Sequence, residues 1–88
     1  MNLTPIQREQ LRLAILRLCL AALRPGLLLC YLRAEGFQRL EAEELELEII
    51  YLADKQLLIS ASGPVSPELK NWRTTAQGRD CLALQGIA

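Results

Sequence analysis

The sequence predicts a small, mainly helical α+β domain with one β-hairpin, and residues 1–88 form a single unit in this prediction. Three observations favour it. A chain of 88 residues has material for only one hydrophobic core. Its hydrophobic fraction is 51%, and ten basic side chains balance ten acidic ones, which excludes the composition of a disordered chain. Apolar residues recur at helical spacing before and after residues 57–62. Residues 57–62 themselves form a short apolar stretch, and a cluster of glycine and proline follows it, as in a β-hairpin.

The first helix is expected over about residues 4–23. Thr4 is suited to cap its N-terminus, Pro5 fits the first helical position, and Gln7 completes a capping box. Pro25 marks the end of the helix, since proline does not continue a helix in progress.

From Leu11 onward, apolar side chains point in nearly every direction around this first helix. A helix that is apolar on all sides has to be covered on all sides. The domain itself would cover one stripe, and a second subunit would cover the other. The sequence therefore favours a homodimer with contacts from Leu16, Leu20 and Leu23. The alternative is a central helix that the other elements of the same chain surround.

A second helix is expected over about residues 27–35, where Gly36 supplies a left-handed cap. The third helix is expected over about residues 41–55. Its apolar residues recur on one face at helical spacing, and they are Ala42, Leu45, Ile49 and Leu52.

Two strands and a closing helix are expected after the third helix. The strands are predicted over about residues 57–62 and 71–74. Between them, residues 63–68 are rich in glycine, proline and serine, and they predict a turn that includes one helical turn. Thr75 is expected to cap the last helix, over about residues 76–84.

Two segments resemble parts of a known family. The sequence Tyr-Leu-Ala-Asp-Lys-Gln-Leu-Leu at 51–58 resembles the end of a third helix and the start of a wing. The sequence Trp-Arg-Thr-Thr-Ala-Gln-Gly-Arg-Asp at 72–80 resembles the strand, Thr-x-x-Gly, helix closure of PadR-like and MarR-like regulators. From Leu11 to Leu82, the chain resembles the winged helix-turn-helix superfamily, and most of all the small winged-helix proteins of Mu-like prophages.

The resemblance implies a winged helix-turn-helix fold and a dimeric protein that binds double-stranded DNA or acts in transcriptional control. Such proteins place the third helix in the major groove and the wing along the backbone. Two positions depart from the family. Glu41 stands where a Thr or Ser often caps the third helix, and Gln56 stands where a glycine usually follows the lysine. The basic residues that remain for phosphate contacts are Arg39, Lys55, Lys70 and Arg73.

The charge of the third helix argues against that role. Residues 40–55 carry six acids and one base, whereas residues 1–39 carry six arginines and two glutamates. The neutral total thus hides a dipolar molecule whose most acidic segment lies where DNA is expected. Phosphate would be repelled there, because affinity for DNA depends on basic groups that neutralise phosphates.

A protein-binding surface is the second function that the residues favour. Opposite its core face, the third helix carries an apolar centre with carboxylates around it, the pattern of a protein contact. A basic protein partner would suit it. Leu47, Ile50 and Tyr51 would make the contact, with Glu43 and Glu46 at its rim. The alternative is a solvated acidic face whose glutamates serve only as good helix formers.

Catalysis, metal binding and membrane insertion are not expected. The chain has no histidine, and Cys19, Cys30 and Cys81 are too widely spaced for a zinc site, so they are interpreted as buried or half-buried thiols in a reducing compartment. No catalytic set or cofactor motif is present. The apolar run Leu13–Leu23 has eleven residues, and a spanning helix needs about 20. A cytoplasmic protein without enzymatic activity, cofactor or small-molecule substrate is therefore predicted.

Overall fold

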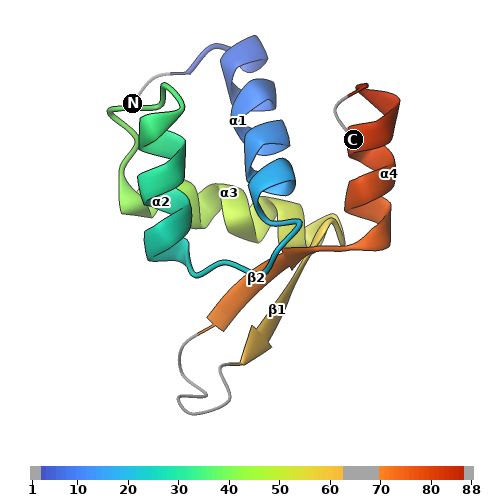
Figure 1. Ribbon diagram of the computed structural model, residues 1–88. Helices are drawn as coiled ribbons and strands as arrows, with labels where there is room; N and C mark the ends of the chain where they lie inside the picture. The colour runs from blue at the N-terminus through green and yellow to red at the C-terminus, as the bar shows by residue number, and fades with distance from the viewer. Residues whose placement is uncertain (1–2, 63–69, 87–88) are drawn as a thin grey trace.

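The computed structural model describes residues 3–62 and 70–86, shown in Figure 1. The elements in these two ranges are α1 (Pro5–Leu18), α2 (Pro25–Ala34), α3 (Ala42–Asp54), β1 (Leu58–Ser62), β2 (Lys70–Thr74) and α4 (Ala76–Leu84). Helix α1 lies between α2 and α4, α3 crosses below them, and the hairpin projects away from the helices (Figure 1). The predicted mainly helical α+β class and the predicted element order are both confirmed, in a layout consistent with a winged helix.

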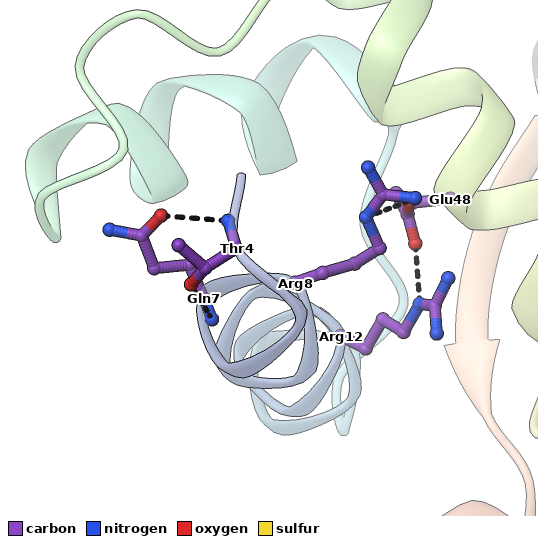
Figure 2. A network of polar contacts seen from close by, with 5 residues as sticks. All are labelled: Thr4, Gln7, Arg8, Arg12 and Glu48. Carbon is purple, nitrogen blue, oxygen red and sulfur yellow. Dashed lines mark hydrogen bonds and ion pairs between the residues drawn. The ribbon is translucent and has the colours of Figure 1, made fainter. Parts of the chain in front are cut away.

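The N-terminus of α1 is closed by the predicted capping box. The Gln7 backbone N–H donates to the Thr4 hydroxyl at 3.1 Å, and the Thr4 backbone N–H donates to the Gln7 side-chain carbonyl at 3.0 Å. Figure 2 shows both bonds at the start of the helix. They satisfy two backbone donors that have no partner within the helix.

The predicted end of the first helix is wrong, because α1 stops at Leu18 and Cys19 caps it. The segment that follows pairs with the edge of β2 instead of continuing the helix. The Leu23 N–H donates to the Trp72 carbonyl at 3.0 Å, and the Trp72 N–H donates to the Leu23 carbonyl at 2.8 Å. The Cys19 carbonyl accepts from the Thr74 N–H at 2.8 Å. These tertiary hydrogen bonds override the local helix propensity of the apolar run.

The other helices begin and end close to the predicted residues. Helix α2 begins two residues early because Pro25 occupies its first turn, where proline's missing N–H is not needed. Gly36 follows the end of α2 with φ of 125°. Helix α3 begins after Glu41, whose backbone N–H donates to the Glu44 carboxylate at 3.3 Å. This carboxylate serves the N-terminus of α3 although the Thr or Ser of the family is missing.

Strands β1 and β2 form an antiparallel pair in which Leu58 is opposite Thr74, and Ser60 is opposite Trp72. The turn predicted at residues 63–68 lies outside the described residues. On the inner side of the hairpin, the Thr74 hydroxyl donates to the Leu16 carbonyl at 2.6 Å and is buried there. This bond joins the second strand to the end of α1.

The core is a single cluster of apolar side chains from all four described helices and from β1. It includes the predicted Leu45, Ile49 and Leu52 of α3. No helix among residues 3–62 and 70–86 combines the length and the apolar character that crossing a membrane requires.

The junction of β2 and α4 explains the Thr-x-x-Gly motif. The Thr75 hydroxyl accepts from the Gly78 N–H at 3.1 Å and donates to the Gln56 carbonyl at 2.8 Å. A Cβ atom on Gly78 would lie 2.6 Å from the Leu57 carbonyl oxygen and 2.5 Å from Cγ2 of Thr74. Only glycine fits, because real Cβ atoms do not approach a backbone oxygen so closely.

Candidate functional site

A groove lies between the start of α2, the first half of α3 and strand β2. Its volume is about 850 Å³, which is in the range of ligand and peptide sites. The groove is lined by Arg24, Pro25, Gly26, Leu27, Ala42, Glu46, Ile49, Ile50, Lys70 and Trp72.

The groove has an apolar lining that is partly open to solvent. Leu27 is 45% exposed and Ile50 is 47% exposed, whereas Ile49 beside it belongs to the core. Trp72 is half-buried, packs against the core and contributes to the lining.

Charges of both signs line the same groove, and they come from different elements. The acid, Glu46, comes from α3, whereas the bases come from the N-cap of α2 (Arg24) and from β2 (Lys70). All three side chains are exposed. None of them makes an ion pair with another described residue.

The residues predicted to bind protein lie in three places. Ile50 and Glu46 lie in the groove. Glu43 and Leu47 are exposed on α3, and Leu47 is 66% exposed. Tyr51 lies elsewhere, because the Arg12 guanidinium lies 3.8 Å from its ring centroid and the Lys55 Nζ lies 5.5 Å from it. The aromatic ring is thus engaged by cations of its own chain.

The acidity of α3 is partly neutralised by α1. Figure 2 shows Glu48 between two arginines: its carboxylate lies 2.6 Å from Arg12 Nε and 4.0 Å from Arg8 Nε. Glu48 is half-buried at this contact. Arg17 and Glu35 form a second ion pair, between α1 and the end of α2. The partners are 18 or more residues apart in the sequence, so the spacing of charges along one helix contains no sign of these pairs.

The residues predicted to contact DNA do not share one surface. Side chains alternate between the two faces of a strand, so Lys70 and Arg73 point to opposite faces of the hairpin. Lys70 lies in the groove on the same face as Trp72, whereas Arg73 is exposed on the other face. Lys55 lies beside Tyr51 at the end of α3. Arg39 is exposed in the connection between α2 and α3.

The residues predicted to make dimer contacts along the first helix do not all lie on it, because α1 ends at Leu18. Leu16 is only 1% exposed and belongs to the core, so the prediction that it contacts a second subunit is wrong. Leu20 and Leu23 lie beyond the end of α1. Leu20 is exposed, and Leu23 is half-buried against the core beside β2. The apolar run is therefore divided between the helix and the segment beside β2, and it does not by itself require a second subunit.

The three thiols differ in exposure. Cys19 is buried, Cys81 is half-buried and Cys30 is exposed on α2, so the prediction of a buried or half-buried thiol is wrong for Cys30. Burial raises the pKa of the Cys19 thiol to about 12, because an apolar surrounding disfavours the thiolate.

Sequence reasoning missed the contributions of Arg24, Leu27 and Trp72 to the groove. In the sequence, Arg24 and the residues after it indicate only a helix break. The position of α2 against α3 and β2 is what makes them part of a surface.

Comparison of the chain with protein-family models, with curated proteins and with solved structures gives no match. The order of the described elements is compatible with a winged helix.

Proposed function

We propose that this chain is a winged-helix domain, related to the small prophage proteins it resembles, that works by binding protein through α3 and the adjoining groove. The observation that supports this most is the exposed Ile50 in a groove lined by apolar side chains and by charges of both signs. An apolar centre with a charged border is typical of protein contacts.

The outer side of α3 supports the same function. In winged-helix proteins that read DNA, this helix enters the major groove and presents Arg, Lys, Asn or Gln to the bases. Here the exposed positions include Glu43, Glu46, Leu47 and Ile50. Carboxylates repel phosphates, and isolated aliphatic side chains provide little discrimination between base pairs.

Binding to double-stranded DNA is the second candidate, and one observation favours it. The hairpin projects from the helices (Figure 1), and it carries Arg73, exposed on its outer face and without an ion pair to any described residue. A single phosphate contact of this kind would give weak, salt-sensitive binding without sequence preference.

Replacing Ile50 tests the protein-binding function. Ile50→Lys places a charge in the groove, whereas Ile59→Lys makes the same change on the hairpin at a site of similar exposure, 47% against 51%. We expect the immobilised wild-type chain and the immobilised Ile59→Lys variant to retain the same bound proteins, including an untagged copy of the chain. The immobilised Ile50→Lys variant should no longer retain them. Circular dichroism should show all three chains folded. Equal retention by all three chains would contradict protein binding at this surface.

A fluorescence-anisotropy titration against a random-sequence duplex tests the second candidate. At about 50 and 200 mM salt, the range in which phosphate contacts show, we expect no binding by the folded chain. Binding that falls steeply with salt, and that Arg73→Glu weakens for every sequence alike, would favour DNA binding by the hairpin instead.

A further inference from the structure

The groove is lined by charges of both signs. One carboxylate, Glu46, comes from α3, and two cations, Arg24 and Lys70, come from the α2 and β2 sides. We propose that the occupant of the groove is the same groove of a second copy of this chain, in a two-fold symmetric homodimer. This inference rests on the proposed function and names its partner.

In a two-fold symmetric dimer, the charges of one groove would face charges of opposite sign in the other. In such an interface each contact occurs twice, since residue i of one copy meets residue j of the other and the reverse. When two grooves face each other, Glu46 of one copy faces Arg24 and Lys70 of the other, at both ends of the interface. A purely basic partner would satisfy Glu46 but meet two cations, and a purely acidic partner would meet a carboxylate. A second copy satisfies both signs.

The apolar part of the groove fits the same occupant. Leu27 and Ile50, each nearly half exposed, would cover their counterparts, and the half-buried Trp72 would lie beside them. Aromatic and aliphatic residues at the centre with Arg and other charges around them are the arrangement of stable interfaces. The net charge of the chain is zero, so no overall repulsion opposes association of two copies.

The experiment exchanges the charges of the groove. Glu46→Arg makes the charged groove residues all basic, and Arg24→Glu/Lys70→Glu makes them all acidic. Sedimentation velocity over a concentration series should show the wild type as a dimer. For each variant alone, the dimer dissociation constant should rise at least about tenfold. Mixed in equal amounts, the two variants should form a heterodimer, because acidic and basic grooves then face each other at both ends.

Matched controls carry the same changes outside the groove. Asp80→Arg reverses an exposed acid on α4, and Arg73→Glu/Arg79→Glu reverses two exposed bases. Both controls should dimerise like the wild type. Formation of the heterodimer also shows that both groove variants are folded.

Three results would overturn the homodimer: a monomeric wild type, groove variants that dimerise as well as the wild type, or variants that fail to assemble when mixed. Failure of the proposed function looks different. If the wild type is monomeric but binds other proteins that the Ile50→Lys variant does not bind, only the homodimer is overturned. A dimer that is insensitive to Ile50→Lys and to the charge exchange would overturn the homodimer through the groove. Equal retention of other proteins by the wild type, Ile50→Lys and Ile59→Lys would overturn the proposed function.

Discussion

The junction of β2 with α4 and the groove beside α3 differ in the roles of their residues. Residues at the junction stabilise the fold, whereas several residues beside α3 are exposed. At the junction, Thr75 and Gly78 have structural roles, since Thr75 makes two hydrogen bonds and Gly78 leaves room for the Leu57 carbonyl oxygen. On α3, Leu47 is 66% exposed and Ile50 is 47% exposed.

This difference separates residues that a fold requires from residues that a function requires. The Thr-x-x-Gly segment is part of the resemblance noted in the sequence, yet its geometry serves packing. A resemblance at that segment is therefore informative about fold and silent about partners. Apart from Trp72, the groove residues lie outside the two segments on which the resemblance is based, and the groove's exposed apolar and charged residues are the ones that the fold leaves unexplained.

Substitution of Gly78 should give the largest effect on stability. Gly78→Ala is expected to lower the free energy of unfolding by about 1–3 kcal/mol, because the new Cβ would overlap the Leu57 carbonyl oxygen and Thr74. The loss should appear although alanine is the better helix former by about 1 kcal/mol. Urea denaturation followed by circular dichroism measures it.

The control for this experiment is Gly26→Ala, in the first turn of α2. A Cβ at Gly26 would meet nothing within 4 Å. Its stability should stay the same or rise by up to about 1 kcal/mol, through the lower entropy of the unfolded chain. Equal behaviour of the two variants would mean that the close approach at Gly78 has no energetic weight.

Gln56 should give a smaller effect of opposite sign. Its φ is 63°, a left-handed conformation that costs a residue with a Cβ about 1–2 kcal/mol. Gln56→Gly should raise the free energy of unfolding by about 0.5–1 kcal/mol, once the greater freedom of glycine in the unfolded chain is subtracted. Gln56→Ala keeps the Cβ and should leave the free energy of unfolding nearly unchanged, and thermal melts of the two variants measure the difference. A glycine variant no more stable than the alanine variant would disprove strain at this position.

The outer side of α3 should give the smallest effect. Leu47 is 66% exposed, so Leu47→Ala should change the free energy of unfolding by less than about 0.5 kcal/mol. Guanidinium denaturation of a dilute sample, at which any dimer has dissociated, is the suitable measurement. A loss above about 1 kcal/mol would show that this side of α3 takes part in the packing of the domain, and the contrast with the junction would disappear.

Local signals in the sequence were sufficient for most of the fold. Capping residues, prolines and helical spacing are short-range features, so the start of α1 and the core face of α3 could be predicted. The end of α1 could not, because hydrogen bonds between Leu23 and Trp72, far apart in the chain, decide where that helix stops.

The candidate site was predicted only in part, for the same reason. Periodicity on one helix identified Ile50 and Glu46 as outward-facing. The partners that make a groove with them, Arg24 and Lys70, come from elements whose positions depend on the packing of the whole chain. Likewise, the pairing of Glu48 with Arg12 could not be expected from the charge of residues 40–55 taken alone.

Because Cys19 is buried at the end of α1, its reaction with a thiol reagent reports when α1 and β2 separate. Thiol reagents attack the thiolate, and with a pKa of about 12 and no exposure, Cys19 is protected as long as α1 and β2 stay joined. Cys30, exposed on α2, has no such protection. The ratio of alkylation rates at these two sulfurs, followed by mass spectrometry in the native protein, therefore measures how often the helix end and the strand separate.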